Sequence, residues 1–254
     1  MTDAMRTAPC WDQHKPSERL RGRKILVTGA ASGIGRRTAE VFALEGASLA
    51  LFDRSAAALQ QVAETTGGSA YGVDVTDDAA TMKAAEQAAA AMGGIDGILN
   101  AAGIVVSGPV GEVDAATYQR VLNVNLLGPY IVVRACLNWL QAAPFATIVN
   151  IASGQGLLPN APNMTAYAAS KGGVVTLTRA LAAELAPTIR VNSVCPGIVD
   201  TPMTAGLPLS VAPYALKRVA SPLEIAQVIL FLTGNESAFM TGAAIAVDGG
   251  RTFH

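Results

Sequence analysis

From residue 24 to the end of the chain, short apolar runs alternate with longer stretches rich in alanine and leucine. The short runs are apolar on both faces, which is typical of strands in a parallel sheet covered by helices on both sides. The predicted strands are residues 24–29, 47–53, 69–74, 95–101, 146–153, 189–196 and 243–250. The predicted helices are residues 34–46, 55–66, 77–92, 114–143, 165–186 and 222–234. The alternation therefore predicts the α/β class, with a doubly wound, seven-stranded parallel sheet.

The predicted elements form one domain of the Rossmann type, because no repeat or low-complexity linker divides the chain. We expect a polar N-terminal extension over residues 1–20 and the domain over residues 21–254. Residues 201–217 carry three prolines and break the alternation. Such a segment is a natural lid or substrate loop.

Composition excludes several classes of function. The net charge is −1 and no basic block is present, which argues against nucleic acid as a partner. No run of about 18 consecutive apolar residues appears and the opening residues lack the apolar core of a secretory signal, so we expect a cytoplasmic protein that does not cross a membrane. Three widely spaced cysteines and two histidines near the chain ends predict no disulfide framework, no metal site and no histidine triad.

A glycine-rich segment, TGAASGIG at residues 28–35, follows the first predicted strand directly. Gly29, Gly33 and Gly35 allow a tight turn and a close approach of the backbone to a pyrophosphate, with Ser32 and Ile34 between them. The following helix would present free N–H groups and its positive dipole end to the phosphates. The alternative is a turn that serves only strand–helix packing.

Asp53 ends the second predicted strand, 18 residues beyond Gly35. A carboxylate near this distance accepts hydrogen bonds from the adenosine ribose and repels a 2′-phosphate, which favours NAD over NADP. Arg54 follows directly and would suit a 2′-phosphate. The alternative is that Asp53 only leads into the next helix, where Ser55 is a good N-cap.

Tyr167 and Lys171 are four residues apart in a predicted helix, so they project from the same face. A fixed positive charge favours the phenolate and lowers the pKa of a tyrosine, which lets the phenol exchange a proton with an alcohol. Taken alone, such a pair is more often a packed tyrosine beside a solvated lysine. The case for chemistry depends on the motifs that precede it.

Six motifs in order resemble the compact type of the short-chain dehydrogenase/reductase family. They are TGAASGIG, NAAG (100–103), NVNLLG (123–128), IVNIAS (148–153), YAASK (167–171) and CPGIVDTPM (195–203), and the match runs from about Arg21 to Gly250. Two departures stand out. Ser153 and Tyr167 are 14 residues apart where the family more often has 13, and Ala101 replaces a commoner asparagine.

The resemblance implies a role for each matched residue. Tyr167 is the acid/base, Lys171 lowers its pKa and binds the nicotinamide ribose, and Ser153 holds the substrate oxygen. Asn125 holds a water that links Lys171 to solvent. The implied cofactor contacts beyond those of the glycine loop, Asp53 and Arg54 are Asp74, Val75, Asn100, Ala101, Ala102, Gly103, Tyr167, Lys171, Pro196, Gly197, Ile198 and Thr201. The implied substrate contacts are Ser153, Gln155, Tyr167 and Met203.

The sequence therefore predicts reversible hydride transfer between NAD(H) and a secondary alcohol or its ketone, a small molecule it does not identify. One alternative is an NADPH-dependent 3-oxoacyl reductase of the same family, which would use Arg54 for the 2′-phosphate. Another is a non-catalytic NAD-sensing protein, which the presence of Ser153, Tyr167 and Lys171 disfavours. We also expect a homotetramer, with small and apolar positions such as Val132 and Cys136 exposed on the long helices.

Overall fold

The computed structural model describes residues 14–206 and 209–252. Within them, the strands are β1 (Lys24–Thr28), β2 (Ser48–Asp53), β3 (Ser69–Gly72), β4 (Gly97–Asn100), β5 (Ala146–Ile151), β6 (Ile189–Pro196) and β7 (Ala244–Val247). All pair in parallel, in the order β3-β2-β1-β4-β5-β6-β7. The predicted doubly wound sheet is confirmed, and each predicted strand contains the observed one.

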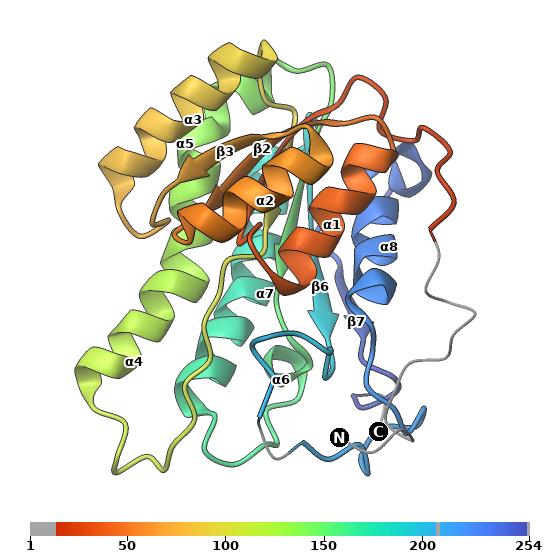
Figure 1. Cartoon of the computed structure of the whole chain (residues 1–254). Coiled ribbons are helices and arrows are strands. Elements are labelled where there is room, and N and C mark those ends of the chain that lie inside the picture. Colours follow the sequence, from red (N-terminus) through yellow and green to blue (C-terminus); the bar gives the residue numbers. More distant parts are fainter. Residues whose placement is uncertain (1–13, 207–208, 253–254) are drawn as a thin grey trace.

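Helices cover both faces of this sheet (Figure 1). The helices are α1 (Gly33–Leu44), α2 (Ala56–Thr66), α3 (Asp78–Met92), α4 (Ala115–Leu122), α5 (Gly128–Ala142), α6 (Gly154–Leu157), α7 (Thr165–Leu185) and α8 (Pro222–Thr233). One apolar cluster joins α1, α2 and α8 to the sheet through side chains such as Phe42, Leu59 and Ile229. A second cluster joins α3, α5 and α7 to the other face through side chains such as Val132 and Leu181. This two-sided burial explains why the strands are apolar on both faces.

Local side chains set where the helices begin and end. The Asp77 carboxylate accepts a hydrogen bond from the Ala80 amide at 2.9 Å and caps α3. At α8, Ser221 and Glu224 exchange hydrogen bonds with each other's backbone amides in a capping box. Helix α2 ends at Gly67, which adopts the left-handed conformation that terminates many helices.

The predicted helix over residues 114–143 is divided by a turn of π-helix at Asn123–Leu127, between α4 and α5. The extra residue in a π-turn changes which side chains face inward, and such turns are frequent at functional sites. Here the turn buries the Asn125 side chain, whose residue is 1% exposed. The prediction of one uninterrupted α-helix was therefore wrong in detail. The π-turn was missed because its backbone stays close to the helical conformation, so no residue pattern in the sequence marks it.

The stretch Ala115–Ala142 is, by length and composition, long and apolar enough to cross a membrane. Half of its apolar window is buried within the protein, as in a core helix, so it is weak evidence of a membrane span. The prediction that Val132 and Cys136 are exposed on this stretch was wrong, since both are fully buried. The large side chains that α5 and its preceding turn do expose are Leu127 and Tyr130.

The chain ahead of β1 is tied to the domain by a buried carboxylate. Glu45, at the end of α1, is fully buried and accepts hydrogen bonds from the Ser17 and Arg19 amides and from His14. Leu20 is also fully buried in the core. Residues 1–13, which form most of the predicted extension, lie outside the described residues, and the boundary at residue 21 stays a prediction.

The chain leaves β1 and β4 in opposite directions at their carboxyl ends, which creates the switch point where such sheets bind ligands. Gly29 lies at this point with φ of +64°, and a Cβ added to it would lie 2.7 Å from the Ala102 amide nitrogen. A Cβ added to Gly35 would lie 2.2 Å from the Gly29 carbonyl oxygen. These close approaches of backbone to backbone require glycine at both positions.

Candidate active site

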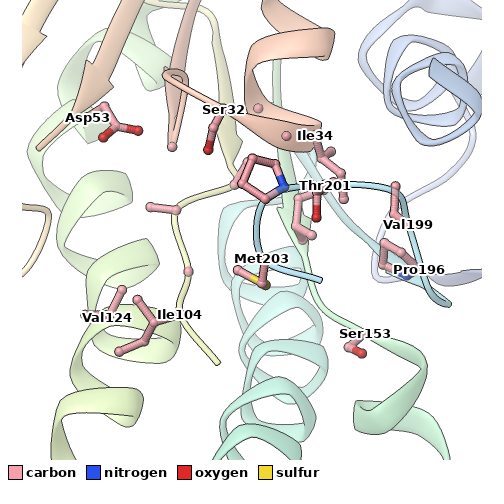
Figure 2. Close-up of a pocket in the computed structure, with 18 of the residues that line it drawn as sticks. Ser32, Ile34, Asp53, Ile104, Val124, Ser153, Pro196, Val199, Thr201 and Met203 are labelled. Carbon is pink, nitrogen blue, oxygen red and sulfur yellow. The ribbon is translucent and has the colours of Figure 1, made fainter. Parts of the chain in front are cut away.

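A cavity of about 290 Å³ lies at the carboxyl ends of the central strands. Figure 2 places Asp53 at one end and Ser153 at the other, with Ser32, Thr201 and Met203 between them. The predicted residues that line it are Gly29, Ser32, Gly33, Ile34, Gly35, Asp53, Arg54, Asp74, Val75, Ala101, Ala102, Gly103, Ser153, Tyr167, Lys171, Pro196, Gly197, Thr201 and Met203. The structure thus brings together segments that are more than 100 residues apart in the chain.

The N-terminus of α1 opens into this cavity. Its N-cap residue Ser32 has an extended backbone, and its hydroxyl makes no capping hydrogen bond. The first turn carries no acidic side chain. The helix therefore keeps its first N–H groups and its positive dipole end available to an anion such as a pyrophosphate.

Three charged residues, Asp53, Arg54 and Asp74, lie at the end of the cavity opposite Ser153. The Asp53 carboxylate accepts hydrogen bonds from the Ala31 amide at 3.1 Å and the Ser55 amide at 2.9 Å, and so joins the glycine loop to the start of α2. Arg54 Nη1 lies 3.6 Å from Asp74 Oδ2. Hydrogen bonds from Thr76 and the nearby Arg54 outweigh burial and hold the pKa of Asp74 below its usual value. This end of the cavity therefore carries two carboxylates and one guanidinium, of which Asp74 and Arg54 lie side by side.

The opposite end combines the end of β5 with one face of α7. Ser153 is the N-cap of the short helix α6, and its Oγ accepts a hydrogen bond from the Gln155 amide at 3.1 Å. Lys171 is buried, and its Nζ donates to the Ile151 carbonyl oxygen at 2.7 Å. The same Nζ lies 5.8 Å from the centroid of the Tyr167 ring. The predicted serine, tyrosine and lysine are therefore gathered around one end of the cavity.

Burial controls the proton affinities in this cluster. It raises the pKa of the Tyr167 phenol above its ordinary value, and a hydrogen bond with Ser153 offsets part of the rise. Burial also lowers the pKa of Lys171 to about 8. The role of Lys171 in lowering the pKa of Tyr167 stays a prediction.

Asn125 does not line the cavity, although it lies beside it. Its Oδ1 accepts from the Ile104 amide at 2.8 Å, and its Nδ2 donates to the Ile104 carbonyl at 2.9 Å and to Ser170 Oγ at 3.0 Å. A Cβ added to Gly103 would lie 3.3 Å from Asn125 Oδ1 and 3.6 Å from Lys171 Nζ. The amide therefore fixes the irregular segment that follows β4 against α7, next to the lysine.

Three predicted contacts lie elsewhere. Asn100 is buried under the cavity, where its Nδ2 donates to Asn150 Oδ1 at 2.9 Å and joins β4 to β5. Ile198 lines a neighbouring hollow with Tyr214 and Leu216. Gln155 directs its Oε1 to the Ala161 amide at 3.4 Å. None of these three residues lines the cavity, and their contacts with cofactor or substrate stay predictions.

Sequence reasoning missed several residues at the cavity wall. They are Phe52, Val73, Ile104, Val124, Ile151, Ala152, Val199, Pro202 and Thr204. Each adjoins a predicted site residue or falls within a quoted motif, so the motifs themselves carried the signal. The segment around Thr201 is held by Thr204, whose Oγ1 donates to the Val199 carbonyl at 2.6 Å.

Comparisons with known proteins agree with this geometry. A family model described as "Enoyl-(Acyl carrier protein) reductase" matches residues 29–252. A 3-oxoacyl-[acyl-carrier-protein] reductase of Thermotoga maritima is 39% identical over 243 residues, covering 91% of this chain and 98% of the relative. A cis-4-hydroxycyclohexanecarboxylate dehydrogenase of Sinomonas cyclohexanicum is 39% identical over 241 residues, covering 91% and 96%. A short chain dehydrogenase of Mycobacterium paratuberculosis, solved bound to NAD, superposes with a TM-score of 0.88 at 31% identity, covering 93% and 100%.

Proposed function

Because the chain belongs to the short-chain dehydrogenase/reductase family, we propose that it transfers a hydride reversibly between NAD(H) and a secondary alcohol or its ketone, with Tyr167 as the proton carrier. Oxidoreductase activity on alcohols or ketones follows from the family. The cofactor preference and the residue roles are our inference. The observation that carries it is the gathering of Ser153, Tyr167 and Lys171 at the end of a cavity that begins at the glycine loop.

The residues of the cavity suit a dinucleotide. Gly33 adopts φ of +55°, and a Cβ added to it would lie 3.3 Å from the Thr201 side chain, so the loop is shaped for backbone contact. The uncapped N-terminus of α1 would hold the pyrophosphate, and Asp53 would hold the adenosine ribose. The nicotinamide, when bound, supplies or accepts the hydride.

The charges at the adenosine end support NAD over NADP. Arg54 is the predicted phosphate ligand, but it lies beside Asp74, and Asp53 adds a second negative charge. A 2′-phosphate placed here would meet a net negative surrounding at short range, which costs binding free energy. The NAD bound to the Mycobacterium paratuberculosis relative is consistent with this preference.

The residues of the chain move the alcohol proton. During oxidation, Ser153 Oγ donates to the substrate oxygen, and the Tyr167 phenolate takes the hydroxyl proton as the carbinol carbon loses hydride. The charge of Lys171, whose Nζ lies 5.8 Å from the centroid of the Tyr167 ring, together with that of the oxidised nicotinamide, would keep this phenolate accessible. Asn125 would hold the water that connects this lysine to solvent. Reduction follows the same path in reverse.

The test is a panel of secondary alcohols incubated with the purified protein and NAD, followed by the absorbance of NADH. We expect turnover with at least one of them. Tyr167→Phe should lose about 100- to 10,000-fold in turnover and keep its affinity for NAD. The exposed Tyr130→Phe is the matched control and should keep full turnover. Undiminished turnover in Tyr167→Phe would refute the proposed role.

A second candidate is NADPH-dependent reduction of a 3-oxoacyl group. The observation that favours it is a hollow next to the adenosine end, lined by Arg54, Arg120 and Asp74, where Arg120 adds a second guanidinium to the one beside Asp74. The similarity to the Thermotoga maritima reductase points in the same direction. Tighter binding of NADPH than of NADH, measured by calorimetry, would select this candidate over the first.

Assembly and location remain predictions. We propose a homotetramer, supported by the exposed Leu127 and Tyr130 beside α5 and by the fully exposed Phe239, which together leave apolar surface for subunit contacts. Sedimentation that finds only monomer at micromolar concentration would contradict it. We keep the cytoplasm as the proposed location.

A further inference from the structure

A buried serine on α7 links the backbone of the catalytic tyrosine to the π-turn at Asn123–Leu127. Ser170 lies between Tyr167 and Lys171 in the chain and is fully buried. Its Oγ donates a hydrogen bond to the Tyr167 carbonyl oxygen at 2.7 Å and accepts one from Asn125 Nδ2 at 3.0 Å. The single proton of the hydroxyl is therefore committed to the backbone of Tyr167, and its oxygen is committed to the amide.

The amide that holds Ser170 has a fixed orientation. Asn125 is 1% exposed. Its Oδ1 accepts from the Ile104 amide at 2.8 Å, and its Nδ2 also donates to the Ile104 carbonyl oxygen at 2.9 Å. Both hydrogens of the amide are thus used, and rotation of this buried group would break all three hydrogen bonds. Ser170 is therefore held by a side chain that is itself fixed by the segment after β4.

Close packing brings α7 against the π-turn. A Cβ added to Gly173, one turn beyond Ser170, would lie 2.8 Å from Leu126 Cδ2. Leu126 follows Asn125 directly in the π-turn. Glycine at position 173 thus lets the helix approach the turn closely. Apolar contact is not directional, so the hydrogen bond between Asn125 and Ser170 supplies the register between helix and turn.

The turn of α7 that Ser170 holds carries both side chains proposed to handle the proton. Tyr167 and Lys171 line the cavity, whereas Ser170 does not. Lys171 Nζ and Asn125 Oδ1 border the same point, since a Cβ added to Gly103 would lie 3.6 Å from the first and 3.3 Å from the second. A displacement of about 1 Å in a reacting group can cost about 100-fold in rate. A small shift of this turn would therefore be felt in the reaction.

We propose that Ser170 is a positioning residue for hydride transfer, which holds the backbone of Tyr167 against Asn125 so that the phenol meets the substrate oxygen in the reactive geometry. The proposal rests on the proposed dehydrogenase function. Ser170 acts through Tyr167 and exchanges no proton with the substrate, because its proton is bonded to a carbonyl oxygen and the residue is fully buried.

A second hydroxyl on α7 has the same kind of partners and provides a matched control. Thr178 is fully buried, donates to the Val174 carbonyl oxygen at 2.8 Å and accepts from Asn150 Nδ2 at 2.9 Å. It lies eight residues beyond Ser170, which is about 12 Å along the helix axis, and it does not line the cavity. Thr178 therefore makes the same link between a buried asparagine and the helix backbone, away from Tyr167.

The experiment measures the single-turnover rate of hydride transfer in Ser170→Ala, with an alcohol that the wild type oxidises, so that product release does not mask the chemical step. We expect this rate to fall about 10- to 100-fold. KM for the alcohol and Kd for NAD should change less than about threefold, because the hydroxyl contacts neither ligand. Ser170→Cys keeps a weak donor of similar size and should have an intermediate rate. If Ser170→Ala does not fold, Ser170→Cys serves for the same comparison.

The control variant is Thr178→Val, which deletes the matched hydroxyl and keeps the shape of the side chain. Ser170→Ala and Thr178→Val should both lower the Tm, because each leaves a hydrogen of a buried amide unpaired. Only Ser170→Ala should slow hydride transfer. An equal fall in the rate in both variants, an unchanged rate in Ser170→Ala, or a change confined to KM or Kd would overturn the proposal and leave the dehydrogenase function standing.

Hydrogen exchange distinguishes failure of this proposal from failure of the proposed function. In Ser170→Ala, backbone amides at residues 168–173 should exchange faster than in the wild type, with little change at residues 176–181, and Thr178→Val should show the reverse. If the wild type oxidises no alcohol, the dehydrogenase function fails, and this pattern would still support the anchoring of Tyr167. Unchanged exchange at residues 168–173 in Ser170→Ala would overturn the anchoring itself.

Discussion

The two ends of the cavity are built in different ways. The cofactor end, around residues 29–35 and Asp53, consists of strand ends and one tight turn, and its contacts are mostly backbone. The substrate end, around Ser153 and Met203, is assembled from the end of β5, α7 and residues 196–204. The first arrangement tolerates little change in residue type, whereas the second can change its side chains without changing the fold.

The sharpest test of this contrast is Gly35→Ala at the cofactor end. The new Cβ would lie 2.2 Å from a backbone oxygen, so the turn or α1 must shift, and we expect a loss of about 3 kcal/mol or more in the free energy of unfolding. Gly67→Ala is the control, because only its φ of +70° is unfavourable there and nothing lies within 4 Å of the added atom. It should cost only about 1–2 kcal/mol. Urea denaturation measures both, and equal costs would remove the steric argument.

The next test addresses Asp53. Within the described residues, it is the only carboxylate that accepts a hydrogen bond from the glycine loop. Asp53→Ala leaves the Ala31 and Ser55 amides without this acceptor and removes the proposed ribose ligand. We expect the Kd for NAD to rise about 10- to 100-fold and that for NADP to rise less. Calorimetry gives both constants. Glu64→Ala, which removes an exposed carboxylate from α2, should leave them unchanged; an unaltered NAD affinity in Asp53→Ala would show that backbone contacts alone hold the cofactor.

Lys171 lies at the substrate end, and its burial has a consequence for stability. The pKa of Lys171 is about 8 in the folded protein, whereas the ordinary value, expected in the unfolded chain, is 10.5. Between pH 8 and pH 10.5 the lysine is therefore protonated in the unfolded chain and neutral in the folded protein. The folded state therefore becomes more stable as pH rises through this window, because the cost of burying the charged lysine is relieved. Lys171→Met lacks this titration. We expect its stability relative to the wild type to fall by about 1 kcal/mol between pH 7 and pH 9.

Urea denaturation at the two pH values measures this difference. Lys83→Met, which removes an exposed lysine from α3, should keep a constant offset from the wild type. A constant offset in Lys171→Met as well would mean that the lysine is not desolvated in the folded protein.

The smallest effect is expected at the substrate end. Met203 is 42% exposed at the cavity wall, so Met203→Ala removes little buried surface. We expect KM for the alcohol to change less than about fivefold, with NAD affinity and stability unchanged. A change in NAD affinity larger than that in KM would erase the proposed division between the two ends.

Much of this molecule was predictable from local sequence. The glycine loop, Asp53 and the Tyr167–Lys171 pair were found because each depends on spacing within one turn or one helix. The π-turn at Asn125 was not, since its backbone is nearly helical and nothing in the residue pattern marks it. The burial of Asn100 was also missed, because its partner Asn150 is 50 residues away on the next strand.

The sequence by itself determined the parallel sheet, the order of its elements and the chemistry that the motifs carry, because apolar periodicity and backbone conformation are local properties. Only the tertiary structure decided the proton affinities and the substrate end. Burial, which raises the pKa of Tyr167 and lowers that of Lys171, depends on everything packed around them. The substrate end depends on how β5, α7 and the segment after β6 meet, which no spacing along the chain encodes.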